Sequence, residues 1–251
     1  MITEYHRPHT LEEALKLLAR PGVRPLGGGT WLTQQRQIDF EVVDLQRLGL
    51  NRLDKMGNKL EIGATVTLQS LLEFDALPKA LQSAIKLEAP LNLRNAATVA
   101  GALIACDGRS SFATAMLALD ARCSIAGGEP VLMHLGDLLP LREEQLRGKL
   151  ITTIEIPLNL KLAFEYVART PADRPILCAA LAQWPSGRTR LVLGGWGNSP
   201  TVAMDGSDAT GLEPAARNAA YNADDEWASS EYRRQVAVTL AKRCLKTIRE
   251  S

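Results

Sequence analysis

The chain has 251 residues, of which 46% are hydrophobic, and this is enough apolar material for one large core or two smaller ones. Because 29 Lys and Arg residues nearly balance 28 Asp and Glu residues, the composition indicates neither a nucleic-acid-binding surface nor an acidic tail. No apolar stretch approaches the ~18 residues of a membrane span, and residues 1–8 lack the features of a signal peptide, so we expect a cytoplasmic protein.

The first part of the chain alternates short helices and strands. Thr10 and Glu13 have the spacing of a capping box, which predicts a helix over residues 11–18 with its apolar residues on one face. Pro21-Gly22 is expected to close this helix. The further segments, in chain order, are a strand at 24–26, strands at 40–45 and 59–62, helices at 68–74 and 79–88, and strands at 121–125 and 150–156.

A second unit is expected to begin near residue 160. Strands are predicted at 162–169 and 176–184, and a hairpin turn at Ser186-Gly187 leads into a strand at 188–193. A fourth strand at 201–204 and a loop at 205–211 precede a closing helix at 230–249. In that helix Val236, Leu240 and Cys244 recur every four residues, and the basic residues expected on the exposed side are Arg233, Arg234, Lys242 and Arg243. Strands grouped before helices predict an α+β fold.

The four cysteines, Cys106, Cys123, Cys178 and Cys244, are widely spaced along the chain. A disulfide framework or an iron–sulfur site needs clustered thiols, and this pattern provides none. We therefore expect small, buried, free thiols.

Two segments rich in small residues are candidate ligand-binding loops. The first, residues 25–32, has consecutive glycines, which allow positive φ angles and a close approach of a ligand. Its backbone N–H groups are suited to binding a pyrophosphate. It is not the G-x-G-x-x-G fingerprint, since Leu32 occupies the last glycine position. The second segment contains Thr98 followed by small residues. From the residues alone, either segment is equally well explained as a tight, close-packed turn.

The order of motifs along the chain resembles one protein family. The motifs are PLGGGT at 25–30, IGATVT at 62–67, LRNAATVAG at 93–101 and AMLALDA at 115–121. The resemblance continues in RTPAD at 169–173, LGGW at 193–196, SSEYRR at 229–234 and LAKR at 240–243. In this order they resemble the FAD-binding medium subunit of the molybdenum hydroxylases, the family of xanthine dehydrogenase and aerobic carbon monoxide dehydrogenase.

The resemblance implies a fold and a cofactor. It implies a PCMH-type, vanillyl-alcohol-oxidase-like FAD-binding domain with two α/β subdomains at 1–158, and a smaller α+β domain of the carbon monoxide dehydrogenase flavoprotein C-terminal type at 160–251. FAD is expected to bind non-covalently, with its pyrophosphate between the two segments. The implied cofactor-binding residues are Pro25, Leu26, Gly27, Gly28, Gly29, Thr30, Trp31, Leu32, Thr98, Val99, Ala100, Gly101 and Ala102.

The resemblance also implies partners. A small subunit with two [2Fe-2S] clusters delivers electrons to the flavin, and a large molybdopterin subunit oxidises the substrate. The expected assembly is a dimer of such heterotrimers, in which the flavin passes electrons to NAD⁺, quinone or oxygen. Trp196 is a candidate anchor at a subunit interface.

Several residues depart from the family pattern near the expected flavin. Gly27 replaces an alanine, and Trp31 replaces a small polar residue, where it either stacks on the cofactor or fills its space. Ala100 replaces a glycine and Ala102 a polar residue, and losing one such hydrogen bond costs on the order of 1 kcal/mol. Ser111 stands where the family usually has an acidic residue, with Asp107 nearby. Glu165 stands where some members have a lysine.

These departures leave open a flavin-free scaffold subunit. An independent flavin oxidase is disfavoured, because no substrate-site acid, base or flavin-attachment residue stands out. Arg169 and Asp173 are expected to form an ion pair or to cap a strand end.

Overall fold

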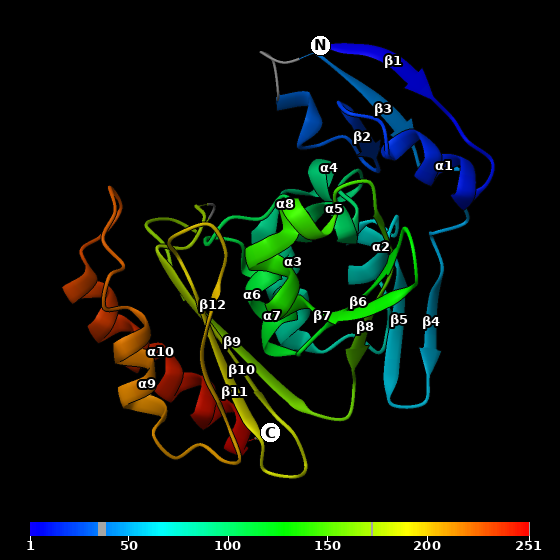
Figure 1. Cartoon of the computed structure of the whole chain (residues 1–251). Coiled ribbons are helices and arrows are strands. Elements are labelled where there is room, and N and C mark those ends of the chain that lie inside the picture. The colour runs from blue at the N-terminus through cyan, green and yellow to red at the C-terminus, as the bar shows by residue number, and fades with distance from the viewer. Residues whose placement is uncertain (35–38, 172, 251) are drawn as a thin grey trace. The chain divides into compact units, whose positions relative to one another are not determined.

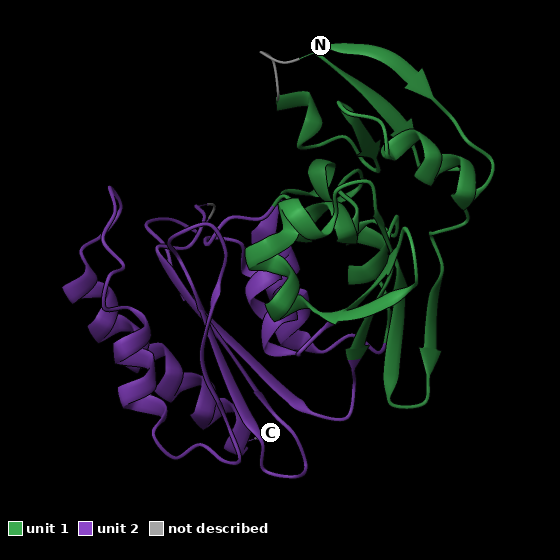
Figure 2. Ribbon diagram, in the orientation of Figure 1, with its two compact units in different colours: residues 1–75, 90–105, 122–156 green, residues 76–89, 106–121, 157–251 purple. Residues whose placement is uncertain are grey.

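The structure is a computed structural model that describes residues 1–34, 39–171 and 173–250. It contains two compact units, each made from several chain segments (Figure 2). Unit 1 consists of residues 1–75, 90–105 and 122–156, and unit 2 of residues 76–89, 106–121 and 157–251. This division describes packing, and the domain boundaries expected at 1–158 and 160–251 stay a prediction.

Unit 1 holds two sheets (Figure 1). The first is parallel, has the order β1-β3-β2, and is made of β1 (Ile2–His6), β2 (Val23–Leu26) and β3 (Phe40–Asp44). The second has the order β4-β5-β8-β6-β7. Its strands are β4 (Leu53–Met56), β5 (Lys59–Gly63), β6 (Arg122–Ala126), β7 (Val131–His134) and β8 (Leu150–Pro157).

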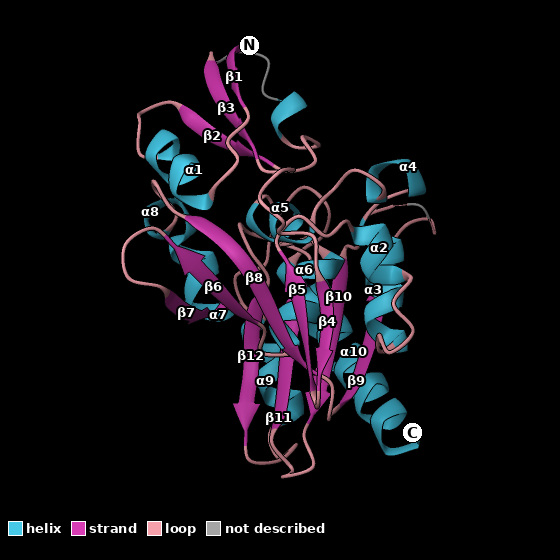
Figure 3. Ribbon diagram, turned by 90° about the vertical axis from the view of Figure 1, so that its right-hand side faces the viewer, coloured by secondary structure: helices cyan, strands magenta, loops and turns pink. Residues whose placement is uncertain are grey.

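Short helices connect these strands (Figure 3). They are α1 (Leu11–Leu18), η1 (Leu32–Gln34), α2 (Leu68–Leu72), α4 (Leu91–Arg94), α5 (Val99–Ile104), α7 (Leu135–Leu138), η2 (Leu139–Leu141) and α8 (Arg142–Gln145). The capping box predicted for α1 is confirmed, because the Thr10 hydroxyl accepts a hydrogen bond from Glu13 N at 3.2 Å and the Glu13 carboxylate accepts one from Thr10 N. Gly22 follows this helix with φ of 80°, a left-handed conformation that favours glycine.

Unit 2 is a four-stranded antiparallel sheet of order β12-β11-β10-β9 with helices on both faces. The strands are β9 (Lys161–Val167), β10 (Leu177–Gln183), β11 (Thr189–Gly194) and β12 (Thr201–Gly206). Helices α9 (Leu212–Ala219) and α10 (Ser230–Glu250) pack with the strands around one apolar core, while α6 (Ser111–Ala118) also contacts β10 and β11, and α3 (Lys79–Glu88) contacts β9. The α+β fold class is confirmed.

The hairpin predicted at Ser186-Gly187 is confirmed. Trp184 N donates to Arg188 O at 2.9 Å, and Gly187 has φ of 93°. Gln183 and Thr189 face each other as the first pair of the β10–β11 ladder. The helix at 79–88 is also found as expected, while β12 extends to Gly206, two residues into the predicted loop.

Some elements carry no clear periodic signal in the sequence. Strand β1 is a polar, largely exposed edge strand, so it lacks the alternation of a half-buried strand. Helix α6 is buried at every position, so it has no polar face to reveal a helical period. Residues 98–102, which the sequence suggested as a turn, are the N-cap and first residues of α5.

The closing helix requires one correction. Arg233 was expected on the exposed face of α10, but its side chain is fully buried. Its guanidinium donates to Gly195 O at 3.2 Å and pairs with the Asp225 carboxylate at 2.8 Å. The basic residues of this segment therefore do not form a single solvated face.

None of the helices in the described part of the chain is long and apolar enough to cross a membrane. The four cysteines are buried and free, as the sequence predicted. Burial raises the pKa of the Cys123 and Cys178 thiols to about 12, so both are protonated at neutral pH.

Candidate functional site

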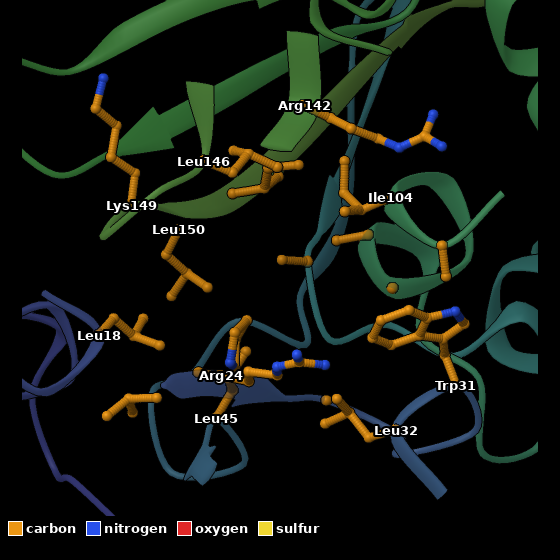
Figure 4. Close-up of a pocket in the computed structure, with 18 of the residues that line it drawn as sticks. Leu18, Arg24, Trp31, Leu32, Leu45, Ile104, Arg142, Leu146, Lys149 and Leu150 are labelled. Carbon is orange, nitrogen blue, oxygen red and sulfur yellow. The ribbon is translucent and has the colours of Figure 1, made fainter. Parts of the chain in front are cut away.

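A cavity of about 680 Å³ lies in unit 1 (Figure 4). This volume falls in the range of about 300–1,000 Å³ that is usual for small-molecule sites. Four stretches of chain supply most of its lining. They are residues 18–25, 27–32, 98–105 in part, and 142–151 in part, with single contributions from Leu45 and Ala64.

The segment after β2 lines this cavity with its backbone. Gly29 has φ of 70°, a left-handed conformation that turns the chain sharply at this point. None of the five backbone N–H groups from Gly27 to Trp31 donates a hydrogen bond to a residue that the structure describes. Successive unused N–H groups in such a turn form a concave anion-binding site. The first segment therefore offers the donors that a pyrophosphate requires.

The glycines of this segment have a packing role as well. A Cβ atom on Gly28 would lie 1.6 Å from Ala96 O, and one on Gly27 would lie 2.8 Å from Thr98 Oγ1. The chain approaches the 96–98 segment so closely that a side chain is excluded. The requirement for glycine at position 28 therefore follows from contact with the protein's own backbone, whether or not a ligand binds.

The second segment uses its backbone donors internally. Val99 N donates to Val66 O at 2.8 Å, and Ala100 N donates to Ala64 O at 3.3 Å. Thr98 caps α5, since its hydroxyl accepts a hydrogen bond from Gly101 N at 3.2 Å, and a Cβ on Gly101 would lie 2.7 Å from that oxygen. These N–H groups are engaged by the protein, so the second segment presents a small-residue wall.

Most of the residues expected to bind the cofactor line the cavity. Those that do are Pro25, Gly27, Gly28, Gly29, Thr30, Trp31, Leu32, Thr98, Ala100 and Gly101. Leu26 packs against Leu32, Phe40 and Val42, and Val99 is fully buried, so neither side chain faces the cavity. Ala102 is also absent from the lining, and the loss of a polar side chain there removes no group from the cavity wall. The assignment of FAD to these residues stays a prediction.

Trp31 forms part of the wall. Its side chain is 43% exposed, and the guanidinium carbon of Arg24 lies 5.8 Å from its ring centroid. Since the cavity persists with the indole in place, Trp31 borders the space without filling it (Figure 4).

Basic residues from outside the two small-residue segments also line the cavity. Among the described residues, Arg20, Arg24, Arg142, Arg147 and Lys149 line it, against a single acidic residue, Glu143. Arg20 is neutralised by the Glu41 carboxylate at 3.0 Å, and the positive charge that remains in excess on the lining favours an anionic ligand. Residues 142–151 belong to none of the sequence motifs, although three basic residues close to Gly148, which has φ of 67°, were a usable signal.

Ser111, which stands where the family pattern has an acidic residue, lies in the first turn of α6, and the carboxylate of Glu88 lies at the start of that helix. Glu88 accepts hydrogen bonds from Ser110 Oγ at 3.0 Å and from Phe112 N at 2.9 Å, so it satisfies the N-terminus of α6. Burial raises the pKa of Glu88, although these two hydrogen bonds oppose the shift. The Ser111 hydroxyl is buried without a hydrogen-bond partner in the described part of the chain.

Asp107, the nearby acid, is engaged elsewhere in unit 2. It forms a bidentate pair with Arg174, whose Nη1 lies 2.8 Å from Oδ2. Burial alone raises the pKa of Asp107, but the hydrogen bonds and charge of Arg174 outweigh it and hold the pKa below its ordinary value. This pairing indicates a structural role for the carboxylate.

Two further expectations concern unit 2. Arg169 does not pair with Asp173 in the described structure, and its guanidinium carbon instead lies 4.4 Å from the ring centroid of Trp227. Glu165 lies opposite Ala179 in the β9–β10 ladder. Its strand, β9, packs against α10, and burial, followed by the charge of Glu165, raises the pKa of Cys244 in that helix.

Comparison with known proteins gives consistent matches. The family model described as the FAD-binding domain in molybdopterin dehydrogenase matches residues 1–159. The uncharacterized protein YgfM of Escherichia coli K12 is 27% identical over 248 residues, covering 96% of this chain and 94% of that protein. The glyceraldehyde dehydrogenase medium chain of Sulfolobus acidocaldarius is 28% identical over 220 residues, covering 80% and 78%.

A solved structure shares the fold over almost the whole chain. A chain of reconstituted carbon monoxide dehydrogenase from Oligotropha carboxidovorans superposes with a TM-score of 0.83 at 24% identity, covering 98% of this chain and 96% of that chain. Because the family model spans well over half of the residues, the chain belongs to the family of FAD-binding domains in molybdopterin dehydrogenases.

Proposed function

We propose that this protein is the FAD-binding medium subunit of a molybdenum hydroxylase-type dehydrogenase and that FAD occupies the cavity of unit 1. The observation that carries the proposal is the run of five backbone N–H groups from Gly27 to Trp31 on the cavity wall that find no partner among the described residues. They supply donors for the diphosphate in a place where a close-approaching side chain is absent. Thr98 and Gly101 also line the cavity.

The rest of the lining suits the remainder of a dinucleotide. Leu18, Leu45, Leu146 and Leu150 provide apolar side chains on the left of the close-up (Figure 4). Planar ring systems bind against such walls, while a few polar groups fix their orientation. This chain's own residues thus bind and orient the cofactor and shield part of it from water.

FAD, when bound, supplies one- and two-electron redox chemistry that the side chains do not provide. We propose that the electrons come from the [2Fe-2S] clusters of a small partner subunit and leave to an external acceptor. A large molybdopterin subunit oxidises the substrate, and the assembly is a dimer of heterotrimers. The four buried, separate cysteines support this division of labour, since they leave no clustered thiols for an iron–sulfur site within the chain.

The cofactor is tested on the full-length protein purified under native conditions. We expect the two-band absorbance spectrum of an oxidised flavin, and release of FAD by acid, in about one equivalent per chain. If neither is found, the protein is incubated with FAD and separated from free cofactor by gel filtration. The absence of flavin after this reconstitution contradicts FAD binding.

The assembly is tested separately from the cofactor. Native purification from the source organism, followed by mass spectrometry of co-eluting chains, is expected to recover an iron–sulfur subunit and a molybdopterin subunit. Elution as a monomer with neither subunit, at low and at moderate salt, contradicts the assembly.

A flavin-free scaffold is the second candidate. It is favoured by the N–H groups of residues 99–102, which donate to groups of the protein itself, and by Gly28 and Gly101, whose small size packing alone explains. A scaffold co-purifies with the partner subunits without flavin, whereas a flavin subunit brings FAD into the complex. The flavin content of the purified complex therefore separates the two candidates.

A further inference from the structure

Arg24 differs from the other cations that line the cavity because aromatic rings hold its guanidinium. The side chain extends from β2 and is half-buried. Its guanidinium carbon lies 5.0 Å from the ring centroid of Phe40 and 5.8 Å from that of Trp31. Cation–π contacts of this kind restrict the position of a guanidinium while leaving its N–H groups available.

No carboxylate balances this charge in the part of the chain that the structure describes. Arg24 forms no ion pair there, whereas Arg20, which lines the same cavity, is held by the Glu41 carboxylate at 3.0 Å. A half-buried cation without a counter-charge is unfavourable, because burial removes part of its hydration. A bound anion would therefore stabilise the charge of Arg24, whereas the charge of Arg20 is already balanced by Glu41.

The same region offers unused neutral donors. The N–H groups of Gly27–Trp31 begin three residues after Arg24, and both line the cavity. In the close-up the guanidinium of Arg24 extends toward Trp31 (Figure 4). Two independent features, an unpaired cation and a row of free amides, thus converge on one anion site.

We propose that Arg24 provides the counter-charge for the diphosphate of the bound dinucleotide and that Trp31 is the positioning residue that fixes the Arg24 guanidinium. The proposal rests on the proposed function and names the charged group of that site. It also gives Trp31 a role, since an indole at this position holds a cation where the family pattern has a small polar residue. A guanidinium presents paired N–H groups that match phosphate oxygens, so Arg24 adds charge to the neutral amides.

The test compares Arg24→Gln with Arg20→Gln in the full-length chain. Each variant is titrated with FAD, and binding is followed by flavin fluorescence at low salt. We expect Arg24→Gln to weaken FAD binding about ten- to hundredfold, because a charge-assisted phosphate contact is lost. Arg20→Gln is expected to stay within about twofold of the parent, since the Arg20 charge is already held by Glu41.

Salt and a second variant distinguish charge from a structural effect. Added salt should weaken FAD binding to the parent more than to Arg24→Gln, because screening acts on the charge that the variant lacks. Trp31→Leu should weaken FAD binding severalfold, and the double variant Trp31→Leu/Arg24→Gln should lose less than the two single effects combined. Additive losses overturn the positioning role of Trp31.

Inorganic pyrophosphate separates failure of this inference from failure of FAD binding. If FAD binds and Arg24→Gln matches Arg20→Gln, the inference is wrong while the proposed function stands. If the parent binds no FAD, pyrophosphate is tested alone for a rise in the thermal midpoint. A rise in the parent and in Arg20→Gln that is lost in Arg24→Gln supports the anion site, and no rise in the parent overturns it. If Arg24→Gln does not fold, Arg24→Met replaces it in every comparison, because methionine also lacks the charge.

Discussion

Two short segments that line the same cavity differ in whether their backbone N–H groups have hydrogen-bond partners. The segment at Gly27–Trp31 leaves five N–H groups without a partner in the described structure. In the second segment, the N–H groups of residues 99–102 donate to Ala64, Val66 and Thr98. Both are rich in small residues, yet only the first presents donors to a ligand. Composition alone does not distinguish them, because hydrogen-bonding partners decide which amides are free.

The glycines of both segments are explained by contacts within the protein. Gly28 excludes a side chain because Ala96 O lies in the way, and Gly101 because the capping Thr98 hydroxyl lies in the way. Both glycines are required by the packing of unit 1 and persist with or without a cofactor. The free amides and Arg24 are therefore the stronger indicators of an anionic ligand in this chain.

The largest expected effect is that of Gly28→Ala on stability. The added methyl group would lie 1.6 Å from Ala96 O, so the two segments must separate. We expect a loss of about 1–3 kcal/mol in the free energy of unfolding, which lowers the thermal midpoint by roughly 2–4 °C per kcal/mol. Thermal unfolding without FAD measures this. If the variant keeps the parent midpoint but no longer binds FAD, glycine is required at position 28 for contact with the phosphates, and the packing explanation is wrong.

Thr98→Ala is expected to have an intermediate effect. It removes the hydroxyl that accepts the hydrogen bond from Gly101 N at the start of α5. Loss of such a cap costs about 1 kcal/mol, and Thr98→Ser should retain most of the stability because it keeps the hydroxyl. Urea unfolding of the three proteins measures the difference. Equal stability of Thr98→Ala and Thr98→Ser contradicts the capping role.

The smallest expected effect is that of Ala100→Gly, which restores the glycine of the family pattern. Since Ala100 N already donates to Ala64 O, we expect FAD affinity to change less than about twofold. Stability should fall by about 0.5–1 kcal/mol, because glycine is unfavourable in a helix. Ala102→Gly is the matched control, since its side chain lies outside the cavity lining. A tenfold gain in FAD affinity for Ala100→Gly alone shows that the second segment contacts the phosphates.

Local signals in the sequence were sufficient for several elements. The capping box of Thr10 and Glu13 predicts α1, and the Ser186-Gly187 turn between alternating segments predicts the β10–β11 hairpin. These signals work because the groups that interact lie within a few residues of one another. Helix α6 was not predicted from the sequence, because a helix that is buried on every side has no polar face.

Contacts between distant segments decided the remainder. Arg233 reads as one of several basic residues on a helix, yet it is buried because Asp225 and the Gly195 carbonyl meet its guanidinium. Glu88 accepts hydrogen bonds at the N-terminus of α6 because α3 brings its carboxylate there. Neither pairing has a spacing that the sequence reveals.

The sequence by itself determined the family, the α+β class and the order of the two small-residue segments. Only the tertiary structure decided which of those segments has free donors and that residues of the 142–151 stretch line the cavity. It also decided that Arg24 lines the cavity with no ion pair to a carboxylate of the described chain. The reason is physical. Turn and helix propensities are properties of neighbouring residues, whereas the satisfaction of a backbone amide or a charge depends on groups that folding brings together from distant positions.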